Sequence, residues 1–114
     1  MLNKAKSLEL ARSKYGVVLE NANTHYSKVN AGKAVWWIEI PIAKFEKFEF
    51  INLVVEQSGD VTLLKVPTEF FRNNLSGFRI REQKQVVCLE LDIDTFQNVI
   101  GEAKVSFKQF VISS

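Results

Sequence analysis

The chain has 114 residues, of which 46% are hydrophobic, 25% charged and 11% aromatic. This composition is typical of one folded globular domain covering residues 1–114, and it excludes a disordered or collagen-like chain. No apolar run approaches the roughly 20 residues of a membrane-spanning helix, so we expect no membrane partner. Fifteen Lys and Arg against thirteen Asp and Glu leave a formal charge of +2, which by itself indicates neither a nucleic-acid nor a membrane partner.

The first third of the chain indicates one helix, a short strand and a long loop. Apolar residues at three- and four-residue spacing predict a helix over residues 2–15, and Gly16 can end it in the left-handed conformation. Residues 17–20 fit a short strand. The polar, Asn-rich segment 21–33 is typical of a loop.

The apolar segments in the middle of the chain predict the sheet. Residues 34–40 have the β-branched and aromatic content of a strand, whose alternation sends Trp36 to the core and Trp37 to the opposite face. Residues 41–48 fit one or two helical turns. Residues 50–55 are apolar on both sides, as in a strand covered on both faces, and residues 61–66 return as its hairpin partner.

The last third of the chain indicates two short helices, two strands and a less regular end. Residues 67–75 predict a short helix, and residues 78–81 and 85–91 predict strands joined by a turn. We expect a second short helix, capped by Asp94 or Thr95, around Phe96, Val99 and Ile100. The final segment 105–112 fits neither the strand nor the helix period well, so strand and helix both stay open there.

These elements together predict an α+β fold. We expect a single compact domain with a mixed or mainly antiparallel sheet of five or six strands, an N-terminal helix across one face and short helices at the edges.

The scarcity of His and Cys narrows the possible chemistry. His25 and Cys88 are the one His and the one Cys, so a structural zinc site, which takes four such ligands, is not expected. Cys88 lies in an apolar strand and fits a buried thiol in a reducing, cytoplasmic setting. The five Gly stand too far apart for a phosphate-binding loop, so we expect no cofactor and no metal.

The order of the elements supports one comparison with a known family. Helix, three strands, helix and strand resembles the core of the restriction-endonuclease-like fold of PD-(D/E)XK nucleases. That resemblance implies a metal-binding Asp and an acid-x-Lys pair on the central hairpin. Here Lys65 fills the Lys position, but Leu63 replaces the acid and the partner strand offers Asn52, so the resemblance implies an incomplete catalytic set.

Basic residues beside aromatic residues form the strongest surface signal. Arg and Lys neutralise phosphates, and an exposed aromatic ring can stack on a base. The same pattern also fits a solvated face or a protein interface, because Trp, Tyr and Arg are enriched at such interfaces. The candidate nucleic-acid-binding residues are Arg72, Arg79, Arg81, Lys28, Lys33 and Trp37.

We therefore expect a non-catalytic binding domain rather than an enzyme, with nucleic acid as its partner. One alternative is a protein-interaction or homodimerisation module that uses Trp37 and the aromatic residues Phe45, Phe48 and Phe50. The other alternative is a small metal-dependent nuclease, whose candidate residues are Glu82, Lys84, Asp60, Asp92 and Asp94.

Overall fold

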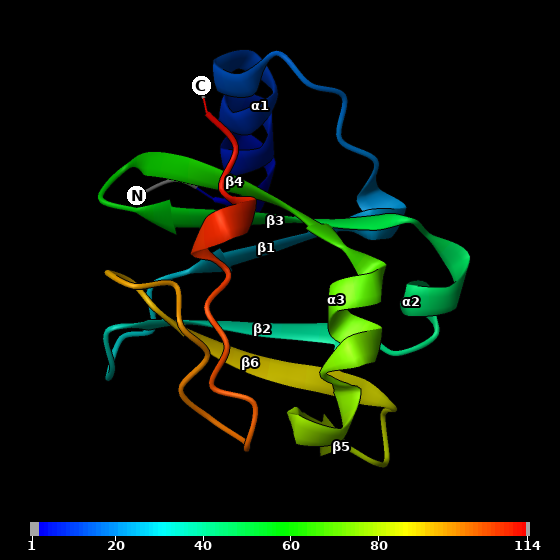
Figure 1. The fold of residues 1–114 in the computed structure, drawn as a ribbon. Helices are drawn as coiled ribbons and strands as arrows, with labels where there is room; N and C mark the ends of the chain where they lie inside the picture. Colours follow the sequence, from blue (N-terminus) through cyan, green and yellow to red (C-terminus); the bar gives the residue numbers. More distant parts are fainter. Residues whose placement is uncertain (1–2, 114) are drawn as a thin grey trace.

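The computed structural model describes residues 3–113 and arranges six strands in two three-stranded sheets (Figure 1). The first sheet has the order β1 (Thr24–Lys28), β3 (Phe50–Gln57), β4 (Asp60–Pro67). The second has the order β2 (Val35–Pro41), β6 (Val86–Asp92), β5 (Arg79–Arg81). The helices are α1 (Lys4–Tyr15), α2 (Lys44–Lys47) and α3 (Thr68–Asn73), with short 3-10 turns at Asn21–Asn23, Leu75–Gly77 and Lys108–Phe110.

The two sheets differ in strand direction and are linked where the chain passes from β1 to β2. In the first sheet β1 runs parallel to β3, and β3 and β4 form an antiparallel hairpin. The second sheet is antiparallel throughout. A single antiparallel bridge between Val29 and Trp36 joins β1 to β2 at the point where the chain passes from one sheet to the other.

The main core fills the space between the two sheets. Side chains of both sheets meet there, including the fully buried Leu53, Leu64 and Leu89. Phe45 and Phe71 close one end of this core, with ring centroids 4.7 Å apart. The indole Nε1 of Trp36 donates to the carbonyl oxygen of Glu56 at 2.9 Å, which satisfies the one polar atom of that buried ring.

A second, smaller core lies on the opposite face of the first sheet. Leu8 and Ala11 of α1 pack there against Val54 and Leu63. The helix begins where the side chain of Asn3 accepts from the backbone N–H of Lys6, and it ends at Gly16 with φ of +63°. β3 is therefore apolar on both sides because both of its faces are covered, as its sequence predicts.

The fold confirms the expected α+β class, with six strands, an N-terminal helix across a sheet and short helices at the edges. The six strands divide between two sheets, one mixed and one antiparallel. Within residues 3–113, none of the helices combines the length and the apolar character that crossing a bilayer requires.

The predicted organisation of residues 17–33 is wrong in two places. Residues 17–20 form no strand, and the expected loop contains β1. The sequence of β1, Thr-His-Tyr-Ser-Lys, is polar, but its backbone pairs with β3, and the Ser27 hydroxyl donates to the carbonyl oxygen of Trp37 at 2.7 Å. Long-range hydrogen bonding thus forms a strand that local apolar patterning does not reveal.

The helix predicted after Asp94 is also wrong. The carboxylate of Asp92 accepts from the backbone N–H groups of Asp94 and Thr95, at 2.8 and 3.0 Å, and this makes a turn. Phe96 then takes a φ of +61°, which no right-handed helix accommodates. Segment 105–112 forms one 3-10 turn and isolated bridges, including Val111 to Leu64 at the edge of β4.

Candidate functional site

The outward face of the second sheet brings together most of the predicted binding residues. On β2, Trp36 and Ile38 point into the core, so Trp37, which is 37% exposed, points away from it. On β5, Ile80 packs against the core, and Arg79 and Arg81 are exposed on the other side. We call this surface the β2–β6–β5 face; its outward side chains are Trp37, Glu39, Arg79, Arg81, Cys88 and Glu90.

The strand register fixes how these side chains neighbour one another. Trp37 lies opposite Glu90 of β6. Glu39 lies opposite Cys88, which in turn lies opposite Arg79 of β5. One row of the sheet therefore carries the aromatic side chain, and the next carries an acid, a thiol and a guanidinium.

Lys28 extends this face onto the first sheet. Val29 packs against the core and bridges Trp36, so continuing the antiparallel register by one residue sets Lys28 opposite Trp37. Lys28 is exposed. The face thus joins Lys28, Trp37, Arg79 and Arg81 on one side of the strand layer.

Two ion pairs neutralise part of the charge on this face. Lys33 Nζ lies 2.8 Å from Glu90 Oε1, and Arg81 Nη1 lies 2.7 Å from Glu39 Oε2. The hydrogen bond from Arg81 is the main cause that lowers the pKa of the Glu39 carboxyl. Lys28 and Arg79 have no ion pair within the described part of the chain, so their charges remain available.

Cys88 lies beneath these charged side chains. It is fully buried, as the sequence predicts, and its Sγ lies 3.7 Å from Glu39 Oε2. Burial, followed by the nearby charge of Glu39, raises the pKa of the thiol. Cys88 is therefore protonated at neutral pH and is a poor nucleophile.

Arg72 lies away from the β2–β6–β5 face. Its guanidinium donates to the carbonyl oxygen of Phe45 and, at 2.9 Å, to Oγ1 of Thr68. It therefore ties α3 to α2. Phe45, which the protein-interaction alternative places at the surface, is fully buried, so that part of the expected aromatic patch is wrong.

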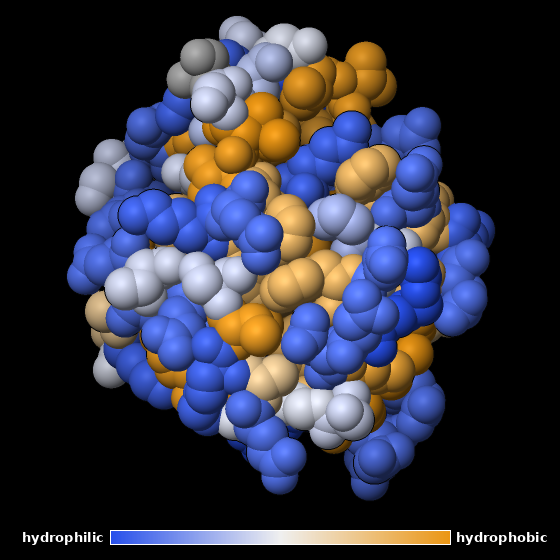
Figure 2. Space-filling view, in the orientation of Figure 1, coloured by the Kyte–Doolittle hydropathy of each residue, from blue (hydrophilic) through white to orange (hydrophobic). Residues whose placement is uncertain are grey.

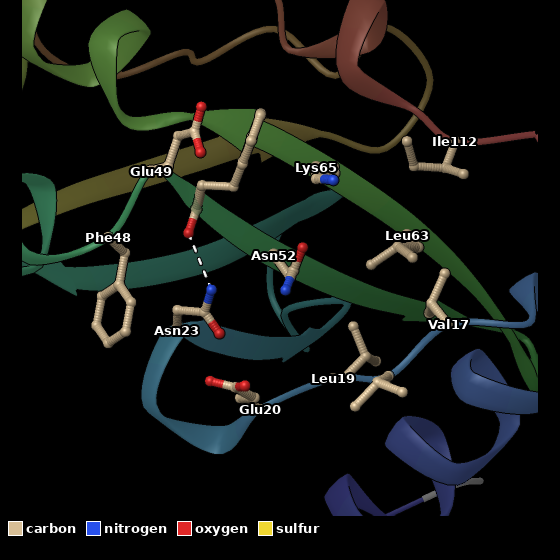
Figure 3. Close-up of a pocket in the computed structure, with 12 residues that line it drawn as sticks. Val17, Leu19, Glu20, Asn23, Phe48, Glu49, Asn52, Leu63, Lys65 and Ile112 are labelled. Carbon is tan, nitrogen blue, oxygen red and sulfur yellow. Dashed lines mark hydrogen bonds between the residues drawn. The ribbon is translucent and has the colours of Figure 1, made fainter.

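A groove of about 600 Å³ opens on the α1 side of the first sheet. Figure 2 shows hydrophobic surface at the top of the molecule, where Figure 1 places the end of α1 and the C-terminal segment. Aliphatic side chains line one end of the groove and polar side chains the other (Figure 3). The aliphatic residues are Val17, Val18, Leu19, Leu63 and Ile112, and the polar or charged ones are Glu20, Asn23, Glu49, Asn52 and Lys65.

Two polar groups in this groove are held in defined positions. Asn23 Nδ2 donates to the carbonyl oxygen of Phe50 at 3.1 Å, which leaves its buried Oδ1 without a hydrogen-bond partner (Figure 3). Lys65 Nζ lies 4.4 Å from the ring centroid of Phe50. The sequence did not indicate this groove, because its walls come from five separate segments of the chain.

The acids of the nuclease alternative are spread across the fold. Asp60 pairs with Lys14 at 3.1 Å beside the β3–β4 turn. Glu82 and Lys84 lie in the β5–β6 turn, and Asp92 lies at the opposite end of β6. Among the residues described, no group of three or more His, Cys, Asp or Glu side chains is arranged to hold a metal ion.

His25, the one His of the chain, lies beside a lysine. Its Nε2 lies 3.2 Å from Lys44 Nζ, where the start of β1 meets α2. Burial is the main cause that lowers the pKa of His25 to about 4, and the charges of Lys44 and Lys4 add to the effect. His25 is therefore neutral at physiological pH.

Comparisons of the chain with protein-family models, with curated proteins and with solved structures find no match. Any functional assignment therefore depends on the residues and surfaces described above.

Proposed function

We propose that the protein is a non-catalytic binding domain that holds single-stranded nucleic acid on the β2–β6–β5 face. The observation that carries the proposal is that Trp37, which lies opposite Lys28, shares one sheet face with the exposed Arg79 and Arg81. A base can stack on the Trp37 ring while the cations neutralise neighbouring phosphates. This mode of binding needs no hydrogen bonds to the edges of the bases, so it does not depend on the nucleotide sequence.

The charge distribution on the face assigns different roles to its cations. Lys28 and Arg79 are available for phosphate contacts without breaking an ion pair. Arg81 and Lys33 reach a phosphate only by leaving Glu39 and Glu90. In both pairs the cation is exposed and the acid is partly buried. A polyanion must therefore compete with the acid for each of these two cations.

A salt-dependent titration tests the proposal. The affinity for a labelled single-stranded oligonucleotide is measured by fluorescence anisotropy at several salt concentrations. Neutralising both free cations, by Lys28→Gln with Arg79→Gln, should reduce the slope of log affinity against log salt by about 1.4, since each single-strand phosphate contact contributes about 0.7. Trp37→Ala should weaken binding by about 1 to 3 kcal/mol through lost stacking.

The matched control removes the same charge from positions outside the β2–β6–β5 face. Lys6 and Lys108 are exposed and lie outside the face, so Lys6→Gln with Lys108→Gln should leave the slope close to that of the wild type. Equal slopes for both double variants, or an affinity that is insensitive to salt, would contradict the proposal. Duplex DNA in a parallel titration separates single-strand from duplex binding.

A protein partner is the second candidate, and the two acids on the face favour it. Glu39 and Glu90 alternate with Lys33 and Arg81, which gives the mixed charge found at protein interfaces. Self-association would appear as concentration-dependent sedimentation that Trp37→Ala abolishes. A monomer at all concentrations would exclude the homodimer.

The nuclease alternative and the restriction-endonuclease-like resemblance stay predictions, as does the cytoplasmic setting. Incubating the protein with plasmid and Mg²⁺ or Mn²⁺ tests the first directly. Loss of any cleavage in Asp92→Asn or Glu82→Gln variants would assign it to those acids.

A further inference from the structure

Basic side chains gather where β1 begins and α2 follows β2. Lys44 Nζ lies 3.2 Å from His25 Nε2, and both side chains are partly buried. Lys47 lies three residues after Lys44 on α2, so the two project from neighbouring positions of the helix. Lys4, at the start of α1, is close enough for its charge to act on both His25 and Lys44.

No carboxylate of residues 3–113 forms an ion pair with this cluster, and Glu46, the acid on α2, is exposed. The three ion pairs of residues 3–113 join Lys14 to Asp60, Lys33 to Glu90 and Arg81 to Glu39, and none involves the cluster. The groups that act on His25 from the packed elements are Lys44 of α2 and Lys4 of α1. On β3 its register partner is the apolar Leu53. Uncompensated positive charge at a partly buried position favours an anion as its missing partner.

We propose that His25 and Lys44 form a binding site for a phosphate-like oxyanion, with Lys4 and Lys47 adding to its positive potential. The site uses no residue of the β2–β6–β5 face, so it does not depend on the proposed function. An ammonium group only donates, so Lys44 donates to the unprotonated Nε2 and His25 retains its N–H at Nδ1. An oxyanion accepts from such donors through short, charge-assisted hydrogen bonds.

The bound oxyanion should change the ionisation of His25. Burial and the neighbouring lysines hold the pKa of His25 at about 4. A dianion beside the ring offsets the repulsion from Lys44 and Lys4 and favours the protonated imidazole. The proton is added at Nε2, so the hydrogen bond from Lys44 is lost and both Lys44 and the Nε2–H can donate to the anion. Binding should therefore raise the pKa of His25.

His25 is the one histidine of the chain, so its ring protons give a resolved NMR signal. Sodium sulfate is the probe, because sulfate stays doubly charged throughout the titration, and NaCl keeps the ionic strength constant. We expect a saturable shift of the His25 Hε1 resonance on adding sulfate. We also expect a pKa higher by at least one unit at saturation, which means at least tenfold tighter binding to protonated His25.

Lys→Met variants distinguish a specific sulfate site from a general screening of charge by added salt. Lys44→Met keeps the length of the side chain and removes its charge, so it should abolish the saturable shift. Lys108→Met removes an exposed charge elsewhere and should leave the shift unchanged. If Lys44→Met perturbs the fold, as judged by the dispersion of the amide spectrum, Lys47→Met and Lys4→Met should each weaken sulfate binding severalfold instead.

The outcomes are distinct. The proposal is overturned if chloride shifts the His25 resonance as sulfate does. It is also overturned if the sulfate shift is unchanged in Lys44→Met, Lys47→Met and Lys4→Met. Repeating the titration with inorganic phosphate and with a mononucleotide identifies the source of the oxyanion by the tighter binder. Binding of oligonucleotide that is lost in the Trp37 variant but retained in Lys44→Met would leave the two surfaces independent.

Discussion

The two sheets of this protein carry similar strands but differ in what covers their outward faces. The first sheet is covered by α1, so Val54 and Leu63 are buried there. No helix packs on the outward face of the second sheet in the part of the chain that the structure describes, and Trp37, Arg79 and Arg81 are exposed on it. The outward residues beneath α1 therefore contribute to stability, whereas the exposed side chains of Trp37, Arg79 and Arg81 are available for binding.

The largest expected effect comes from exchanging outward residues on the two sheets for Ala. Leu63→Ala should lower the free energy of unfolding by about 2 to 5 kcal/mol, because it leaves a cavity beneath α1. Arg79→Ala should change it by no more than about 0.5 kcal/mol. Urea unfolding of both variants measures this; equal effects would show that the second face is also part of a core.

Arg72 is a basic residue that should contribute to stability rather than to binding, because its guanidinium joins α3 to α2. Arg72→Met should lower the free energy of unfolding by about 1 to 3 kcal/mol, since the carbonyl of Phe45 loses its charged donor. Its oligonucleotide affinity should match that of the wild type. A stable variant that has lost oligonucleotide binding would instead place Arg72 in the binding surface.

The stability of the protein should depend on pH through His25, which lies where β1 meets α2. Its pKa of about 4 lies below the ordinary 6.5, so between these values the unfolded chain binds a proton that the folded chain does not. The free energy of unfolding should fall by about 2 kcal/mol as the pH decreases from above 6.5 to about 4, part of the ring being screened by water. Urea unfolding across this range measures the change. In His25→Gln this contribution should vanish, while the titration of carboxylates remains.

The smallest effect tests how well α1 covers the first sheet. The hydroxyl of Ser7 is buried there without a hydrogen-bond partner, and so are Oγ1 of Thr24 and Oε2 of Glu56. Ser7→Ala should stabilise the protein by up to about 1 kcal/mol more than Ser13→Ala, which measures helix propensity alone at an exposed site of the same helix. Thermal unfolding of both variants gives the difference. A larger gain for Ser13→Ala would indicate that the Ser7 hydroxyl has a partner.

Much of the fold could be predicted because local pattern and burial agree. The apolar run of β3 matches its two covered faces, and the alternation of β2 separates buried Trp36 from exposed Trp37. β1 could not be predicted, since its strand depends on pairing with distant β3. The turn after β6 depends on one carboxylate, that of Asp92, which competes with the expected helix cap.

The candidate site could be predicted in part. Alternation indicates that Trp37, Arg79 and Arg81 point outward, but only the strand order places β5 and β2 on either side of β6. The partner of Arg72 is a backbone carbonyl 27 residues away, which no pattern of side chains reveals. The pairing of His25 with Lys44 likewise depends on long-range packing between β1 and α2.

Cys88 is buried beneath the Arg81–Glu39 ion pair, so the rate at which its thiol reacts measures how often this part of the sheet opens. As the chain's one thiol, it can react with an added alkylating reagent only when the side chains above it, or the strands beside it, move apart. The rate of its modification therefore reports how often that surface opens. A ligand that binds across the β2–β6–β5 face should slow the alkylation of Cys88 in proportion to its occupancy. This measurement requires no added label on the protein.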